Sequence, residues 1–336
     1  MSMNDLRYFI ENDKIEQQIY YHYTTIDALY SIVDEKTFWL TSLESSNDKK
    51  ELYYNTNNFL VDFHKICVDE NDQKTKQYFE IIENSIQENK EKFEKACKYK
   101  SSGYALCLSE KKDNLTHWDR YANNCTGVCI GFNVASLEVL IRRFGLTVFG
   151  LGIYDIGKIL YSKEEQKQFI KQVIINEIKK YAFELSNNID VINDLKNNGY
   201  IYAAVIYKRL GKFVKDLAYI DEDEVRVYHD ITSVKDTIRL IKLFGKNIDK
   251  QTYSKVTESF YRFMESIKIK ERNFYISKKG IRSYKKLCLE AIWGSGVIPE
   301  IILGPMCVQN ITELKYFLKA NGLEKTKVSI SQIPIR

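Results

Sequence analysis

The chain has 336 residues, of which 44% are hydrophobic and 28% are charged, so it is long enough to bury a substantial core. No apolar run reaches the roughly 18 to 20 residues of a membrane-spanning helix. The polar segment 1–18 lacks the apolar centre of a secretory signal, and we therefore expect a cytoplasmic protein rather than a membrane or secreted one. The net charge of +5 is mild, and it permits a nucleic-acid partner without requiring one.

The sequence opens with a predicted strand, helix and second strand. Residues 20–24 are rich in aromatic side chains, which favours a strand. The segment 24–35 carries apolar residues at the spacing of one helical face, and Thr24 followed by Asp27 is typical of a helix start with a capping box. The second strand is predicted at 38–42, before a polar turn.

The rest of the chain mixes helices and strands without a regular β-α-β alternation. Further helices are predicted over 74–99, 115–122 and 311–320, and the segment 163–215 is predicted to be mostly helical with Asn-rich breaks near 187–199. Further strands are predicted at 104–109, 127–133, 146–154, 224–229, 286–291, 300–303 and 327–333. This pattern indicates an α+β fold, which we interpret as one elaborated domain spanning residues 1–336.

The first strand places a histidine among tyrosines. A period of two puts Tyr20, His22 and Thr24 on one face of that strand, and Tyr21 and Tyr23 on the other. Two interpretations of His22 stay open. It is either a buried histidine that a backbone carbonyl satisfies, or a ligand-binding side chain at the point where the strand meets a helix.

A later acidic cluster offers two carboxylates and a guanidinium. The alternation predicts that Glu222, Glu224 and Arg226 share one strand face. One interpretation is a solvated acidic turn at the start of an edge strand. The other has Arg226 holding one carboxylate while the second faces a substrate, and close carboxylates would also perturb each other's pKa.

Between these two regions lie Ser109, Trp118 and Tyr121. The two aromatic residues are three positions apart in a predicted helix, so they would share a helical face. They are either aromatic core residues or rings that stack on a planar or cationic ligand.

Several familiar sites are missing from the sequence. The seven cysteines have no zinc-binding spacing, and HExxH is absent, so we expect no metal site. A phosphate-binding loop, a dinucleotide-binding glycine motif and the nucleophile motif G-x-S-x-G are also absent.

Six ordered motifs nevertheless form a recognisable series. They are residues 20–25, residues 39–42 with Asn47, Asp48 and Glu51, Ser109 with 118–122, residues 127–132, Lys215 with Glu222, Glu224 and Arg226, and residues 298–305. In this order they resemble the bacterial family known as domain of unknown function twenty-nine seventy-one. The family is similar to the ADP-ribosyltransferase-like superfamily.

The resemblance implies a split, curved β-sheet core around a cleft for NAD, which acts as co-substrate. The core would comprise about 19–154 and 215–333, with helical insertions at about 60–100 and 155–214. Glu224 is implied as the catalytic carboxylate and Glu222 as its catalytic partner. Contacts to NAD are implied for His22, at the ribose, and for Tyr23, Thr24, Ser42, Asn47, Ser109, Trp118, Tyr121 and Arg226. Tyr121 and Trp118 compete for the position that stacks on nicotinamide.

The implied function is an NAD-dependent ADP-ribosyltransferase of a bacterial or phage-defence toxin type. The acceptor would be nucleic acid or protein, and the mild basic charge favours RNA or DNA. An antitoxin would be a further partner, and no membrane is involved. Two alternatives stay open: an NAD glycohydrolase, in which water replaces the acceptor, and a non-catalytic module that binds a nucleotide or a partner.

Overall fold

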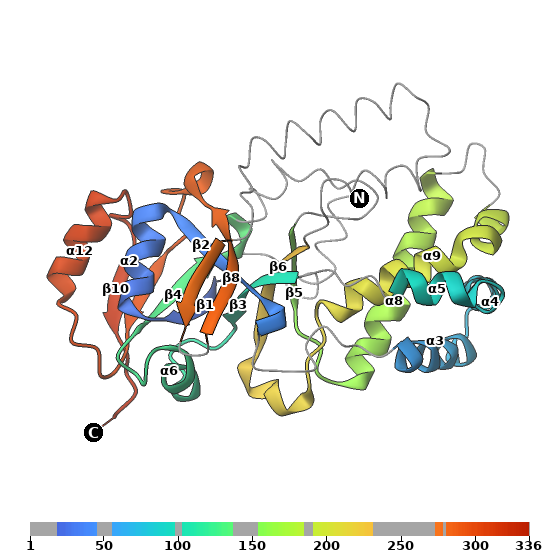
Figure 1. The fold of residues 1–336 in the computed structure, drawn as a ribbon, viewed down its shortest axis with the longest axis horizontal. Helices are drawn as coiled ribbons and strands as arrows, with labels where there is room; N and C mark the ends of the chain where they lie inside the picture. Colours follow the sequence, from blue (N-terminus) through green and yellow to red (C-terminus); the bar gives the residue numbers. More distant parts are fainter. Residues whose placement is uncertain are drawn as a thin grey trace. The chain divides into compact units, whose positions relative to one another are not determined.

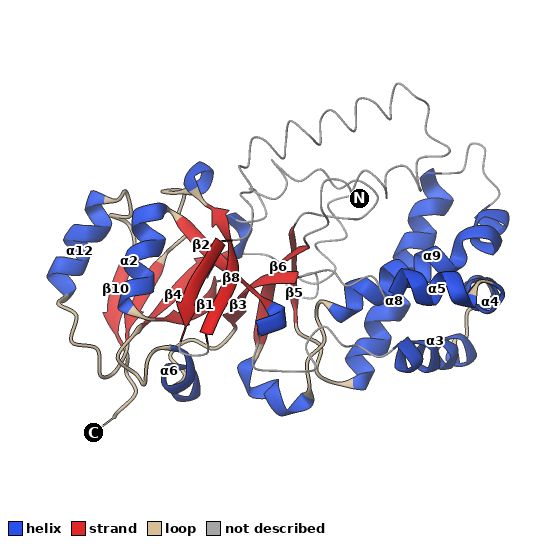
Figure 2. Cartoon of the chain, viewed as in Figure 1, coloured by secondary structure: helices blue, strands red, loops and turns tan. Residues whose placement is uncertain are grey.

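The computed structural model describes residues 19–45, 56–97, 103–136, 154–184, 191–230, 273–277 and 280–335. The chain divides into two compact units. The first comprises Met1–Ser45, Ser102–Lys158 and Asp221–Arg336, and the second comprises Ser46–Ser101 and Ile159–Ile220. The described strands belong to the first unit (Figure 1, Figure 2). The described α-helices of the second unit are α3 (Thr56–Asp69), α4 (Gln73–Glu88), α5 (Lys90–Cys97), α8 (Lys163–Glu184) and α9 (Val191–Gly211).

The described residues of the first unit form a mixed, mostly antiparallel sheet. Its main path runs β10-β9-β4-β1-β3-β2-β8-β7, while β6 pairs with β3 and β5 pairs with β6. Among these pairs only β9 with β10 is parallel. The strands are β1 (Ile19–Thr24), β2 (Thr37–Ser42), β3 (Gly103–Ser109), β4 (Val128–Asn133), β5 (Tyr154–Lys158), β6 (Glu224–Asp230), β7 (Asn273–Ser277), β8 (Gly280–Cys288), β9 (Glu300–Leu303) and β10 (Lys327–Ile330). The predicted α+β class is confirmed.

The sheet divides at β3. This strand pairs along its whole length with β6, so both β1 and β2 must use its opposite edge. The end of β2 pairs with Tyr104 and Ala105 near the start of β3, whereas β1 pairs with Ser109 at its end. Strands β1 and β2 therefore diverge from each other, and Cys107 lies between their two points of attachment.

The two sheet faces carry different cores. Helices α2 (Ile26–Glu35) and α12 (Ile311–Ala320) cover one face and bury a large apolar cluster against it. This cluster includes Tyr20, Phe38, Leu106, Leu108, Ile130, Phe132, Val225 and Val227 from the strands. Helix α6 (Leu115–Tyr121) packs on the other face, where Tyr21, Tyr23, Cys129, Ile302 and Trp118 form a smaller cluster. Full burial of one large apolar side chain stabilises a fold by about 1.5 to 3 kcal/mol, so the larger cluster dominates the stability of this unit.

The start of α2 corrects one prediction. The N-cap is Thr25, whose side chain accepts the backbone N–H of Ala28 at 3.1 Å. The predicted cap at Thr24 is wrong because Thr24 is still the last residue of β1 and pairs with Val128.

Other predicted boundaries also shift. The helix predicted over 74–99 is two helices, α4 (Gln73–Glu88) and α5 (Lys90–Cys97), separated at Asn89. Within 163–215 the described helices are α8 (Lys163–Glu184) and α9 (Val191–Gly211). The strand predicted at 286–291 already ends at Cys288 and is followed by the short helix η4 (Glu290–Ile292). Of the strand predicted at 146–154, only residue 154 lies within the described residues.

The described part of the second unit is helical. Helix α3 (Thr56–Asp69), most of which lies in the helical insertion implied at about 60–100, contributes Phe59 and Phe63 to an aromatic core with Phe79 and Phe93. Each of these four rings is at most 1% exposed, so aromatic burial holds the unit together. No described helix of either unit combines the length and the apolar character needed to cross a bilayer.

Candidate active site

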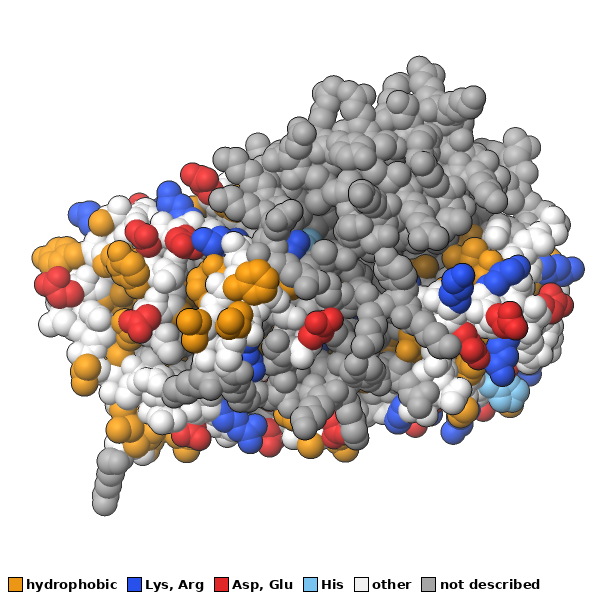
Figure 3. All heavy atoms as spheres, viewed as in Figure 1, with side chains coloured by type: hydrophobic (Ala, Val, Ile, Leu, Met, Phe, Trp, Pro, Cys, Tyr) orange, Lys and Arg blue, Asp and Glu red, His pale blue; other side chains and the backbone are white. Residues whose placement is uncertain are grey.

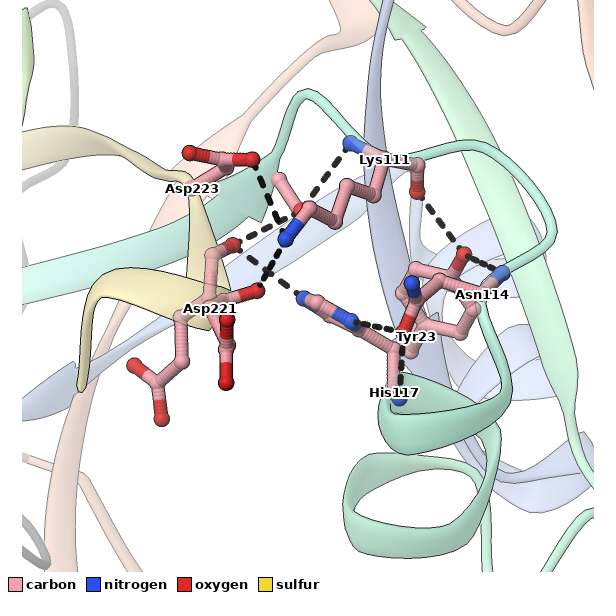
Figure 4. Close-up of polar contacts among 8 residues, drawn as sticks. Tyr23, Lys111, Asn114, His117, Asp221 and Asp223 are labelled. Carbon is pink, nitrogen blue, oxygen red and sulfur yellow. Dashed lines mark hydrogen bonds and ion pairs between the residues drawn. The ribbon is translucent and has the colours of Figure 1, made fainter. Parts of the chain in front are cut away.

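A short acidic segment, 221–223, is held by the end of β3 and the loop that follows it (Figure 4). Three successive carbonyl groups of the segment accept hydrogen bonds from residues 109–111. The donors and acceptors are Lys111 Nζ to Asp221 at 2.7 Å, Ser109 Oγ to Glu222 at 2.8 Å, and the backbone N–H of Glu110 to Asp223 at 3.1 Å. Lys111 also forms an ion pair with the carboxylate of Asp223 at 3.2 Å. The loop therefore fixes the backbone that leads into β6.

The backbone of Asp223 overturns the predicted strand face. Its φ of 39° is left-handed, which a residue other than glycine adopts at a cost. Glu222 consequently ends the short helix η2 (Leu217–Glu222), and β6 begins only at Glu224. Only Glu224 and Arg226 share a strand face, so the prediction that Glu222 belongs to it is wrong.

The carboxylate of Glu222 accepts a hydrogen bond from the hydroxyl of Tyr121. Glu222 is buried, whereas 38% of Tyr121 is exposed at the end of α6. The two aromatic candidates therefore differ in environment, because Trp118 is completely buried in the smaller core. Of the two rings, only that of Tyr121 is open to a ligand.

Glu224 and Arg226 form a buried ion pair within β6. Arg226 Nε donates to Glu224 Oε1 at 2.8 Å, and the exposed fractions of the two residues are 0% and 4%. The sheet register places Glu224 opposite Ser109 and Arg226 opposite Cys107. A charge-assisted hydrogen bond of this kind is strong and directional, so one oxygen of the Glu224 carboxylate is held in a fixed orientation.

His117 lies between the helix cap and the acidic segment. Its Nδ1 is 2.9 Å from the side-chain oxygen of Asn114, and its Nε2 is 3.1 Å from the carbonyl oxygen of Glu222. Burial lowers the pKa of His117, and the charge of Lys111 acts in the same direction, although the carbonyl of Glu222 and the charges of Glu222 and Asp223 oppose the shift. The neutral ring carries a single proton, while two oxygen acceptors face it.

Asp113, two residues before the start of α6, also fixes this helix. This carboxylate accepts hydrogen bonds from Trp118 Nε1 at 2.7 Å, from the hydroxyl of Ser331 at 2.6 Å and from the backbone N–H of Gln332 at 2.8 Å. Burial opposes its ionisation, but these hydrogen bonds together lower the pKa of Asp113. Asp113, which also has a positive φ of 54°, thus joins α6 to the segment after β10.

Tyr23 has a buried position with both sides of its hydroxyl occupied. The hydroxyl donates to the carbonyl of Lys111 at 2.8 Å and accepts the backbone N–H of Asn114 at 2.9 Å. Burial raises the pKa of Tyr23 well above its usual range. These contacts make Tyr23 a support for the loop that follows β3.

His22 fills the gap where β1 and β2 diverge. Its Nδ1 donates to the carbonyl of Cys107 at 3.0 Å, and its ring lies edge-on to the buried ring of Phe38. Burial lowers the pKa of His22. Because Tyr21 is opposite Ser109, and Ser109 is opposite Glu224, alternation puts Tyr21 on the face of Glu224 and His22 on the other.

The remaining candidates are dispersed. Thr24 is partly exposed at the end of β1, and Ser42 is buried at the end of β2 opposite Tyr104. Asn47 lies outside the described residues. The structure thus brings Ser109, Tyr121 and Glu222 into direct contact and places Glu224 and Arg226 beside Ser109, whereas His22 and Ser42 lie apart from this cluster. We call the cluster of Ser109, His117, Tyr121, Glu222, Glu224 and Arg226 the acidic site.

Two residues of this region were not predicted. His117 precedes Trp118 and lies one helical turn before Tyr121, with the two ring centroids 5.9 Å apart. That i, i+4 spacing in a run already rich in aromatic residues is the signal that could have identified it. Lys111 carried no such signal, because its partners lie about 110 residues further along the chain.

The acidic site combines two carboxylates with a guanidinium and a phenol ring. Within the part of the chain that the structure describes, there is no group of three or more His, Cys, Asp and Glu residues suited to a metal ion. Among the side chains of the acidic site, the phenol ring of Tyr121 is exposed, whereas Glu222, Glu224 and Arg226 are buried. They suit a ligand that carries or develops positive charge and has an aromatic ring.

A comparison with family models matches one segment of the chain. Residues 117–227 match the model described as Protein of unknown function (DUF2971). The matched segment contains most of the acidic site, from His117 to Arg226, whereas His22 and Ser109 precede it. Comparisons with curated proteins and with solved structures returned no match. Over residues 117–227 the chain is therefore similar to this family of unknown function, DUF2971.

Proposed function

We propose that the chain transfers ADP-ribose from NAD to a macromolecular acceptor, and that the acidic site carries out the reaction on an ADP-ribosyltransferase-like core. The observation that carries the proposal is the arrangement of two buried carboxylates, Glu222 and Glu224, each bound to a different partner. Tyr121 binds one of them and exposes its ring beside it, while Arg226 orients the other. The division of the sheet at β3 agrees with the split sheet that the resemblance implies.

The reaction would break the bond between C1′ of the ribose and the nicotinamide nitrogen. The bonding electrons leave with nicotinamide, which becomes neutral, and positive charge develops on the ribose. A carboxylate at Glu224 would stabilise that charge in a site where little water screens the interaction. An oxygen or nitrogen of the acceptor then bonds to C1′ and gives its proton to the carboxylate of Glu222.

Tyr121 is the proposed stacking partner of nicotinamide. The ring of this cofactor is cationic before it leaves, and an aromatic face attracts a cation by about 0.5 to 2 kcal/mol. The hydrogen bond to Glu222 would hold the phenol ring in one orientation, which lowers the entropy cost of stacking. The proposal does not depend on His22, whose described contacts support the divergence of β1 and β2.

The acceptor is proposed to be RNA or DNA, on the basis of the net charge of +5. On the face drawn in Figure 3, basic and acidic side chains of the described residues are interspersed. A general electrostatic attraction, rather than a single basic patch among those residues, would therefore bring the acceptor to the protein.

The test is incubation of the purified chain with labelled NAD and a bacterial extract, followed by nuclease or protease treatment. Label that nuclease releases supports the proposal in full, and label that only protease releases assigns a protein acceptor. Free ADP-ribose and nicotinamide without labelled macromolecules would identify a glycohydrolase. If NAD is not consumed under any condition, the proposal is wrong and a binding module becomes the better description.

Substitutions locate the chemistry within the acidic site. Glu224→Gln should lower kcat by about a hundredfold or more, as the loss of a group that stabilises developing charge does in other enzymes. Glu313→Gln, at an exposed position on α12, is the matched control and should leave kcat unchanged. Tyr121→Phe keeps the stacking ring but loses the hydrogen bond that orients it, so it should raise KM for NAD less than Tyr121→Ala does.

A further inference from the structure

Both the side-chain carboxylate and the main-chain carbonyl of Glu222 are held by residues of α6 and by the last residue of β3. Its side-chain carboxylate accepts from Tyr121, and its main-chain carbonyl accepts from Ser109 and faces His117 Nε2. A carbonyl oxygen has two lone pairs, so the hydroxyl of Ser109 leaves one lone pair to face Nε2 of His117. Ser109, His117 and Glu222 are all buried, which removes water as a substitute donor.

Regular secondary structure does not fix the backbone between Glu222 and Asp223. Asp223 has a left-handed φ of 39°, and η2 ends at Glu222, so neither a helix nor a strand fixes the carbonyl of Glu222. The contacts from Ser109 and His117 supply the fixation that regular secondary structure provides elsewhere.

We infer that His117 is a positioning residue that fixes the carboxylate of Glu222 by donating its Nε2–H to the main-chain carbonyl of the same residue. His117 and Tyr121 lie one turn apart on α6, so a single helix positions both the carbonyl and the carboxylate of Glu222. His117 reaches the reacting atoms only through Glu222. The expected effect of His117 on kcat rests on the proposed function. The contact of His117 with the carbonyl of Glu222 does not depend on NAD.

Two substitutions at position 117 separate the two ring nitrogens. A glutamine amide places its N–H group near the position of Nε2, so His117→Gln keeps a donor for the Glu222 carbonyl. An asparagine amide reaches only the position of Nδ1, so His117→Asn loses that donor. We expect His117→Asn to lower kcat about tenfold while KM for NAD stays within about twofold, because one hydrogen bond is lost away from the cofactor. His117→Gln should restore kcat to within about twofold of the unsubstituted protein.

A second measurement does not require turnover. Tyrosine labelled with carbon-13 at Cζ reports by NMR on the hydrogen bond of each phenol, and Tyr121→Phe assigns the signal of Tyr121. This signal should move in His117→Asn and stay in place in His117→Gln, because only the first change releases the Glu222 carboxylate. If His117→Asn fails to fold, Ser109→Ala removes the other donor to the same carbonyl and should shift the same signal.

The outcomes distinguish this inference from the proposed function. An unchanged Tyr121 signal in His117→Asn, or an equal loss of kcat in both variants, overturns the positioning role. If the unsubstituted protein consumes no NAD, the proposed function fails, and the NMR signal alone decides the role of His117. A purely structural role would lower stability in both variants without separating them in kcat or in the Tyr121 signal.

Discussion

The buried ion pair in β6 gives the sharpest stability prediction. Arg226→Met removes the guanidinium but keeps a flexible side chain of similar length that can fill the space. Glu224 then keeps its charge in a buried position without this cation. Removing one member of a buried pair typically costs about 3 to 5 kcal/mol. Here Arg226 is 0% and Glu224 is 4% exposed, and their atoms are 2.8 Å apart, so we expect a loss within that range.

The assay is equilibrium unfolding in urea followed by tryptophan fluorescence. All three tryptophans, Trp39, Trp118 and Trp293, belong to the first unit, so the signal reports on the unit that contains the ion pair. Glu224→Gln and the double variant complete a cycle, and the double variant should lose less free energy of unfolding than the sum of the two single losses. Because the pair is buried, salt should change the losses little. A loss below about 1 kcal/mol for Arg226→Met, or additive losses in the double variant, would refute the reasoning.

Two further predictions concern backbone packing and pH. Gly127→Ala would place a Cβ against the carbonyl oxygen of Thr24, well inside van der Waals distance, and should cost about 2 to 3 kcal/mol in thermal unfolding followed by circular dichroism. Gly211→Ala, with nothing within 4 Å of its added Cβ at the end of α9, is the control and should stabilise by up to about 1 kcal/mol. His22 has a lowered pKa, so the folded state binds fewer protons than the unfolded state, and its stability should fall as pH drops below about 6.5. His22→Asn keeps a donor for the carbonyl of Cys107 but does not titrate. If the free energy of unfolding of this variant falls with pH below about 6.5 as steeply as that of the unsubstituted protein, the account is contradicted.

The sequence predicts best those elements whose signals are local. The strand at 300–303 and the helix at 311–320 agree with β9 and α12 at both ends. The helix begins where Asn310 caps it by accepting the backbone N–H groups of Thr312 and Glu313. Apolar periodicity and a polar cap lie within a few residues of each other, so they are visible without knowledge of the tertiary structure.

The acidic site shows where local patterns fail. A period of two assigned Glu222 to the strand of Glu224, but contacts with the loop after β3 turn the chain at Asp223 before the strand begins. For His22 the sequence left two interpretations open. The observed hydrogen bond to the carbonyl of Cys107 agrees with the interpretation of a histidine that a backbone carbonyl satisfies. Tertiary contacts between distant segments decided both positions, and a single sequence carries no record of them.

The hydrogen bonds to the three successive carbonyls of residues 221–223 restrict how the sequence of this protein can change. The donors lie in residues 109–117, between the end of β3 and the first turn of α6, and the acceptors lie in residues 221–223. The two stretches are far apart in the chain, yet the hydrogen bonds between them fix the position of each against the other. Such stretches should be inherited as a pair: a chimera that imports only one of them from a divergent homologue would bring donors and acceptors that do not match. Exchanging both together would preserve the match, so recombination between related chains should keep the two stretches together.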